Sequence, residues 1–195
     1  MSPRKAVVHE LSRERILAEA QELFATQGYR NLTMRSIAKG MGYSHGALYY
    51  HFKDKGELFY TLVKENFNLL LEMQRAWVVQ APPGDLANLE QMMLEFIRFG
   101  LEHPHHYEIM FVITDPELRK YSRTEQAECL DLFAEAVHSV LAGRPDEKQK
   151  AFSLPWSLFM SMHGFITYCI SFGQTFEDAE KLAQDHVRYL CRGIL

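Results

Sequence analysis

The chain has little of what marks secreted or zinc-bound proteins. Its three cysteines, Cys129, Cys169 and Cys191, are widely spaced and form no CxxC pair. Neither a disulfide framework nor a metal site built on thiolates is indicated, and we expect the three thiols to pack as small core side chains. Arginine and lysine occur near the start, but no apolar segment with a cleavage site follows them, as a signal peptide requires.

Long apolar runs are also missing. An uncharged stretch, residues 152–173, comes closest, but it contains Pro155, His163 and several hydroxyl side chains, which favours a buried helix over a membrane span. The sequence contains no nucleophile elbow, HExxH motif or P-loop, and its glutamates are scattered. An enzyme with a helical fold is therefore the weaker alternative, and we predict no catalytic residue, no cofactor and no metal. We expect a cytoplasmic protein.

The charge is modest overall and unevenly placed along the chain. A net charge of −4 argues against adhesion to nucleic acid over the whole surface. Residues 1–60, however, hold nine lysine and arginine residues against six aspartate and glutamate residues, and the rest of the chain carries a net charge of −7. A basic head on an acidic body fits local contact with phosphate groups.

Apolar residues recur at helical spacing along most of the chain, and no segment alternates for long enough to form a convincing strand. The sequence therefore predicts an all-α fold, with its strongest break at residues 81–85. The expected helices cover residues 12–28, 33–40, 44–51, 54–79, 86–103, 107–112, 122–141, 146–173 and 176–194. We predict an N-terminal arm at 1–11, a helical head at 12–59 and a helical body at 60–195.

Residues 33–52 meet the spatial requirements of a helix-turn-helix. The two short helices of this motif cross steeply, so the residue at the crossing must be small, and Ala38 occupies that position. Four residues later, Gly42 supplies the positive φ that the turn needs. The apolar residues that lock the two helices together are also present: Ile37, Met41, Tyr43 and Leu48. The second helix of such a motif lies in the major groove of DNA.

The pattern extends on both sides of this motif. It comprises Ile16-Leu17, Ala20, Leu23-Phe24, Gly28-Tyr29, Leu32-Thr33-Met34-Arg35, Ile37-Ala38, Gly42, Ser44, Leu48-Tyr49, His51-Phe52, Lys55 and Leu58-Phe59. Over about residues 12–59 the chain thereby resembles the DNA-binding domain of TetR-type transcriptional regulators. The resemblance implies a dimeric, ligand-responsive regulator, usually a repressor. On this basis residues 12–59 are predicted to be the helix-turn-helix DNA-binding domain, and residues 60–195 the ligand-binding and dimerisation domain.

The second helix of the motif is expected to present its N-terminal half to DNA. Its predicted contacts are Ser44, His45, Gly46, Tyr49, Tyr50 and His51. The helix dipole favours nearby phosphate, His45 is placed to reach a base edge, and Gly46 allows close backbone approach. Tyr49 lies where the TetR family usually has tyrosine, whereas Tyr50 either faces DNA or packs inside the head.

Phosphate contacts are expected from the flanking segments. Thr33 and Arg35 begin the preceding helix and Lys55 begins the following one, which suits them to hold the DNA backbone. Arg4 and Lys5 form either a mobile arm that adds attraction independent of sequence or an unstructured leader. Because the head has few basic residues, we expect one head to bind weakly and two half-sites to be needed.

Methionine and aromatic residues are abundant in the second half of the chain, and they form either a plain core or the lining of an apolar ligand pocket. The predicted pocket residues are Met92, Phe96, Phe99, Tyr107, Met110, Phe111, Trp156, Met160, His163 and Tyr168. The segment 103–111, together with Trp156 and His163-Gly164, resembles a TetR subgroup with a Trp…His-Gly signature. A metal site at His103, His105 and His106 is the weaker alternative, because three ligands so close in sequence are cramped.

Small residues along the last two expected helices permit close helix packing. The predicted dimer interface is Ser157, Ser161, Gly164, Thr167, Ser171, Val187 and Leu190. The family resemblance implies that two copies pair through these helices, and a two-fold dimer matches a palindromic operator. We expect a small apolar or amphipathic molecule to shift the helix that begins at Asp54 and release the DNA. A DNA-binding dimer without any ligand is the alternative.

Overall fold

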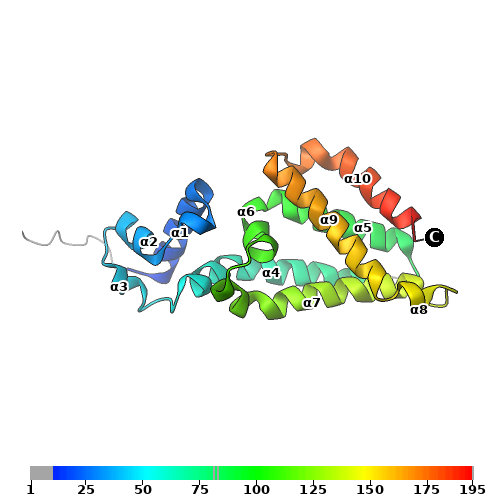
Figure 1. The fold of residues 1–195 in the computed structure, drawn as a ribbon, viewed down its shortest axis with the longest axis horizontal. Helices are drawn as coiled ribbons and strands as arrows, with labels where there is room; N and C mark the ends of the chain where they lie inside the picture. The colour runs from blue at the N-terminus through cyan, green and yellow to red at the C-terminus, as the bar shows by residue number, and fades with distance from the viewer. Residues whose placement is uncertain (1–10, 81, 83, 195) are drawn as a thin grey trace, which may run out of the picture. The chain divides into compact units, whose positions relative to one another are not determined.

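The computed structural model describes residues 11–80, 82 and 84–194, so the predicted contacts of Arg4 and Lys5 lie outside the described residues. Every regular element in the described part of the chain is a helix (Figure 1), which confirms the all-α prediction. None of these helices is long and apolar enough to cross a membrane. The described residues form two compact units, those up to residue 65 with 109–123, and those of 66–108 with 124–194.

The first unit is built from short helices that begin and end at capping residues. Its elements are α1 (Arg13–Gln27), the 3-10 turn η1 (Tyr29–Asn31), α2 (Met34–Gly40), α3 (His45–Leu48) and the first turns of α4 (Lys55–Gln80) and α7 (Pro116–Leu141). The Ser12 hydroxyl accepts a hydrogen bond from the amide of Arg15 at 3.3 Å, and Gly28 ends α1 with φ 71°. The predicted caps of the first helix are therefore confirmed.

The core of the first unit is an aromatic cluster under α1, η1 and α4. Phe24 and Tyr29 each place a ring edge-on to Phe59, at centroid distances of 5.7 and 4.9 Å. Ile16 in α1 and Leu58 in α4 are completely buried in the same unit. Full burial of one such side chain contributes roughly 1.5–3 kcal/mol, so this cluster holds the short helices that could not persist alone.

The second unit is a layered helical body. Besides the remaining turns of α4 and α7, it contains α5 (Leu86–Glu102), α6 (Pro104–Tyr107), α8 (Glu147–Lys150), α9 (Ser153–Ser171) and α10 (Phe176–Arg192). The π-helix η2 (Glu108–Val112) crosses the boundary between the units, because Glu108 belongs to the second unit and residues 109–112 belong to the first. Helices α9 and α10 both pack on α5 (Figure 1). At Gly100 the approach is so close that a Cβ atom would lie 2.7 Å from the Ile166 side chain.

The three cysteines are buried and unpaired, as expected for core side chains. Cys191 in α10 contacts Met93 in α5, with 3.7 Å between the two sulfur atoms. The Arg98 guanidinium of α5 lies 4.1 Å from the centre of the Phe176 ring, so it adds a cation–π contact between the same two helices.

The structure corrects three predicted helices. Helix α7 begins at Pro116, not near residue 122, because the Asp115 carboxylate accepts the amides of Glu117 and Leu118 and proline is well suited to the first helical position. The expected helix at 146–173 is two helices, α8 and α9. The third helix is a single turn, α3, followed by non-helical turns through His51.

Candidate nucleic-acid interface

The turn between α2 and α3 has the predicted geometry. Gly42 adopts φ 77°, in the left-handed region that other residues avoid. Ala38 is completely buried at the crossing, and its carbonyl accepts the amide of Tyr43 at 2.9 Å. Thr33 and Ser36 form a capping box at the start of α2. These local contacts fix the angle at which α3 is presented.

The residues of the second helix form an exposed surface. Ser44, His45 and Gly46 are exposed, as are Tyr49 and Tyr50, with exposed fractions of 47% and 93% for the two tyrosines. The rings of His45 and Tyr49 meet edge-to-face with 5.2 Å between centroids. His51 is half-buried. The structure thus brings five of the six predicted contacts of this helix to solvent, and Tyr50 is not packed inside the unit.

The flanking residues differ from one another. Thr33 and Arg35, at the start of the preceding helix α2, are both exposed. The Thr33 hydroxyl, however, already takes part in the capping box of α2. Lys55 is half-buried, and its amine donates to the Tyr29 carbonyl at 2.5 Å and lies 3.7 Å from the centre of the Tyr29 ring. Burial lowers the pKa of Lys55, while the carboxylates of Asp115 and Glu117 oppose that shift. The predicted phosphate contact of Lys55 stays a prediction, and here the amine is bound within the head.

Arg13 contacts the residues at the C-terminal end of the exposed surface, His51 and Phe52, a role that its place in the sequence does not reveal. Its guanidinium lies 4.1 Å from the centre of the Phe52 ring and donates to the carbonyl of His51. The same group is 3.7 Å from a carboxylate oxygen of Glu57. Arg13 therefore ties α1 to the segment between α3 and α4.

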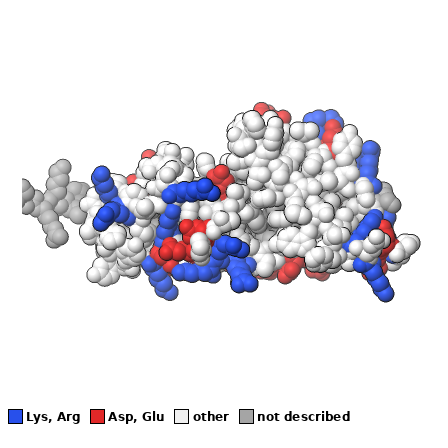
Figure 2. All heavy atoms as spheres, viewed as in Figure 1, with Lys and Arg blue, Asp and Glu red and all other residues white. Residues whose placement is uncertain are grey.

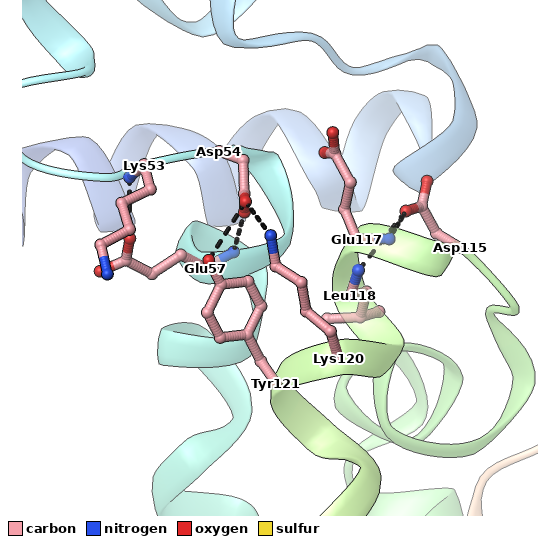
Figure 3. Close-up of polar contacts among 8 residues, drawn as sticks. All are labelled: Lys53, Asp54, Glu57, Asp115, Glu117, Leu118, Lys120 and Tyr121. Atoms are coloured by element: carbon pink, nitrogen blue, oxygen red, sulfur yellow. Dashed lines mark hydrogen bonds and ion pairs between the residues drawn. The ribbon is translucent and has the colours of Figure 1, made fainter.

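Asp54 joins the first turn of α4 to the first turn of α7 within the same unit (Figure 3). One of its carboxylate oxygens accepts the amide of Glu57 at 2.8 Å, which confirms the predicted helix cap. The other accepts hydrogen bonds from Lys120 at 2.6 Å and Tyr121 at 3.1 Å. Tyr121 also stacks on Tyr60, with 6.0 Å between the rings. Residues far apart in sequence are thereby fixed to the start of the helix that follows the DNA-binding motif.

Replacing Asp54 by asparagine tests this junction. Burial raises the pKa of Asp54, but the bonds from Lys120, Glu57 and Tyr121 outweigh it, so the pKa lies below its usual range. A carboxylate with a lowered folded-state pKa stabilises the fold above its unfolded-state pKa, and this contribution is lost as the pH falls through the folded-state value. We expect Asp54→Asn to lower the free energy of unfolding by about 1–2 kcal/mol at pH 7. Urea unfolding measures this.

The loss should shrink as the pH falls below the ordinary range of aspartate, because the wild-type carboxylate then becomes protonated as well. A loss that stays constant from pH 7 down to pH 3 would show that the charge of Asp54 is not what stabilises the junction. Asp178→Asn is the matched control, since that aspartate belongs to the capping box at the start of α10 and forms no ion pair with any described residue.

The predicted pocket residues of the body fall into three groups. Met92, Phe96, Phe99 and Tyr107 are buried in the second unit, with His163 half-buried. Met110 and Phe111 belong to the first unit. Trp156, Met160 and Tyr168 are exposed on α9, with exposed fractions of 46%, 59% and 60%. Trp156 lines a cavity of about 80 Å³. This volume is too small for an ordinary effector molecule.

Three further large apolar side chains are exposed on α10 or at the end of α9. They are Phe172, Leu182 and Tyr189. Of the predicted dimer residues, Ser157, Gly164 and Ser171 are exposed, Ser161, Thr167 and Leu190 are partly exposed, and Val187 is buried inside the unit. Figure 2 shows few charged side chains over the body around α9. We call the exposed residues Trp156, Met160, Tyr168, Phe172, Leu182 and Tyr189 the α9–α10 face.

The weaker alternative of a metal site at His103, His105 and His106 gains no support from geometry. The rings of His103 and His106 lie 6.2 Å apart, and burial lowers the pKa of His106. Nowhere in the described ranges do three or more histidine, cysteine, aspartate or glutamate residues meet in a way that could hold a metal ion.

A rigid two-helix motif with an exposed second helix defines a helix-turn-helix DNA-binding protein. The family model described as "Bacterial regulatory proteins, tetR family" matches residues 16–61, and the model described as "Tetracyclin repressor-like, C-terminal domain" matches residues 89–190. The chain therefore belongs to the TetR family of transcriptional regulators, and it is not an enzyme.

Relatives with curated descriptions support the same assignment. The HTH-type transcriptional repressor AcnR of Corynebacterium efficiens is 30% identical over 152 residues, covering 74% of this chain and 71% of that protein. The AcnR repressor of Corynebacterium glutamicum is 31% identical over 150 residues, with the same coverage. Both of these relatives are transcriptional repressors.

Solved structures show the same fold. The transcriptional regulator FadR from Bacillus subtilis, in complex with stearoyl-CoA, is 18% identical with a TM-score of 0.73, covering 94% of this chain and 100% of that chain. NalD from Pseudomonas aeruginosa, the secondary repressor of the MexAB-OprM multidrug efflux pump, is 22% identical with a TM-score of 0.66, covering 93% of this chain and 96% of that chain.

Proposed function

We propose that this regulator is a cytoplasmic repressor that binds a palindromic operator as a homodimer and leaves it when a small effector binds. The observation that carries the proposal is the exposed surface of His45, Tyr49 and Tyr50 on a motif held rigid by Gly42 and Ala38. The helix that bears this surface enters the major groove, where His45 reads a base edge and Ser44, Tyr49 and Arg35 contact the DNA backbone.

Dimerisation accounts for the α9–α10 face. Exposed large apolar side chains are costly to leave in water, and where they gather in a patch they typically mark an interface. Trp156, Met160, Gly164, Tyr168 and Phe172 follow one another at four-residue intervals, so they form a stripe along α9. We propose that two copies pack these stripes together about a two-fold axis, which gives the symmetry of a palindrome.

The effector is proposed to bind in the second unit, at the cluster that contains Phe96, Tyr107 and His163. Apolar or amphipathic effectors suit a cluster of aromatic rings with one polar pair. The structural neighbour FadR was crystallised with stearoyl-CoA, which supports an effector of this general type. Two heads must stand about 34–36 Å apart, or a multiple of that distance, to enter successive grooves, so a small rotation of each head releases the DNA.

Two substitutions separate base reading from backbone contact. Tyr49→Ala removes about one hydrogen bond per head, so we expect operator affinity to fall by roughly 30-fold for the dimer on every duplex tested. His45→Ala should instead reduce the preference for one base pair in each half-site, by about 1–3 kcal/mol. Fluorescence anisotropy with a bound duplex and single-base variants of it measures both effects. If His45→Ala binds these duplex variants in the same order of affinity as the wild-type protein does, His45 does not read a base.

A further inference from the structure

The two exposed tyrosines of the DNA-binding surface lie outside a regular helix. Helix α3 ends at Leu48, and Tyr49 and Tyr50 lie in the turns that follow it. The amides of His51 and Phe52 both donate to the Leu48 carbonyl, each at 3.0 Å. Because a single helical turn is not stable alone, the direction of the two tyrosines depends on what holds the backbone that comes after them.

Two charged side chains hold that backbone on either side of Phe52. From α1, the Arg13 guanidinium donates to the carbonyl of His51 and lies 4.1 Å from the centre of the Phe52 ring. From α4, a carboxylate oxygen of Glu57 accepts the amide of Lys53 at 2.7 Å (Figure 3). Phe52 itself is buried. Both peptide groups of Phe52 are therefore bound by side chains from other helices.

Arg13 and Glu57 also contact each other. One carboxylate oxygen of Glu57 lies 3.7 Å from the Arg13 guanidinium, and the other oxygen accepts the amide of Lys53. Both side chains are partly exposed, and an ion pair at the surface contributes little to stability. Its main consequence is geometric, since it joins α1, the segment 51–53 and α4 into one network within the first unit.

We propose that Arg13 and Glu57 are positioning residues for DNA binding, which act through the backbone of residues 51–53 on Tyr49 and Tyr50. The proposal rests on the DNA-binding role put forward above and adds two residues that need not touch DNA. Side chains that bind a partner keep their geometry only when supporting hydrogen bonds fix the backbone that bears them. Glu57 is the more informative of the two, because its negative charge makes a direct contact with phosphate unfavourable.

Glu57→Ala distinguishes positioning from charge by the sign of its effect. Removing a carboxylate from the head lowers its repulsion of phosphate, so charge alone predicts tighter DNA binding. Loss of positioning predicts the opposite, and we expect the affinity for a duplex that the wild-type protein binds to fall about tenfold, measured by fluorescence anisotropy. Glu22→Ala is the matched control, because Glu22 is an exposed glutamate of α1 outside this network, and it should bind equally or slightly more tightly. An equal or higher affinity of Glu57→Ala would overturn the proposal.

A second experiment separates positioning from a general loss of stability. If Glu57 acts through the tyrosines, Glu57→Ala should cost less than about threefold in a protein that already carries Tyr49→Ala and Tyr50→Ala, because the side chains that it positions are then absent. A head that is merely destabilised would lose the same factor in both backgrounds. The titrations are made at low ionic strength, with circular dichroism to establish that each variant is folded. Equal losses in the two backgrounds would refute the proposal.

Arg13 is tested through the salt dependence of binding. Each cation that contacts phosphate adds about one to the slope of log affinity against log salt concentration. We expect Arg13→Met to lower affinity about tenfold without changing this slope, and to add little to the loss in Glu57→Ala. A slope that falls by about two, one for each head of the dimer, would make Arg13 a phosphate contact and contradict the positioning role.

These outcomes are separable from the fate of the proposed function. A wild-type protein that binds no duplex would refute DNA binding and the positioning role together. A wild-type protein that binds a duplex, with Glu57→Ala binding it as tightly, would refute the positioning role alone.

Discussion

Replacing Tyr168 by glutamate is expected to convert the dimer into a monomer and to lower operator affinity by at least about 100-fold. Tyr168 is 60% exposed in the middle of the stripe on α9. In a two-fold interface along this helix, each substitution would bury an unpaired carboxylate, and symmetry places it there twice. A monomer keeps one head, which binds one half-site and loses the gain from simultaneous contact. Sedimentation velocity and anisotropy measure the two losses.

The control for this experiment is Val79→Glu. Val79 is 83% exposed near the end of α4, so it offers a large exposed apolar side chain outside the α9–α10 face. We expect this variant to remain dimeric with nearly wild-type affinity. Should Tyr168→Glu sediment as a dimer, the interface must lie elsewhere, and Trp156, Met160 and Phe172 would need another explanation.

Gly56→Ala should destabilise the first unit by at least about 2 kcal/mol. Alanine normally stabilises a helix relative to glycine by about 1 kcal/mol, so the expected sign is opposite to that of helix propensity. The reason is the contact between α4 and α7, where a Cβ at Gly56 would lie 2.5 Å from the backbone carbonyl of Glu117 and 2.8 Å from the amide of Leu118. Backbone atoms cannot turn aside as a side chain can, so one helix must shift.

Gly46→Ala is the matched control, because it is also a helical glycine but has no atom within 4 Å of an added Cβ. Urea unfolding should place Gly56→Ala well below the wild type and Gly46→Ala at or slightly above it. A stabilised Gly56→Ala protein would show that α7 does not dock on α4 in solution. Gly46→Ala can still weaken DNA binding, since that position is proposed to approach the DNA backbone.

Much of the head could be predicted from the sequence because its determinants are local. Gly42 supplies the positive φ of the turn, and Ala38 is the small residue where α2 and α3 cross. Ser12 and Asp54 cap the first turns of α1 and α4. Each of these requirements concerns residues that are neighbours in the chain. The apolar periodicity of α1 and α4 then indicates which side of each helix is buried.

The contacts of Asp54 with Lys120 and Tyr121 could not be predicted in the same way. They join segments more than sixty residues apart, and the Asp115-Pro116 pair at the start of α7 has the pattern of a loop as well as that of a helix start. The grouping of residues 109–123 with the head is a tertiary property for the same reason. Sequence periodicity contains no information about which distant helix provides the partner.

The two faces of α9 were also ambiguous in the sequence. This helix is apolar on most sides, so the periodicity of its residues does not show whether Trp156, Met160 and Tyr168 point into the body or out of it. The structure distinguishes them from Leu158, Met162 and Ile166, which are buried. The proposed pocket is accordingly narrower than the predicted one and centres on Phe96, Tyr107 and His163.

The most direct measurement is the selection of bound duplexes from randomised DNA by the purified full-length protein, followed by sequencing. We predict an enriched palindrome whose half-sites are about 10–10.5 base pairs apart, or a multiple, centre to centre. We also predict that His45→Ala enriches the same palindrome with one position per half-site relaxed. Enrichment of no sequence, or of a single unrepeated site, would contradict the claim that residues 33–52 read DNA as a two-fold pair.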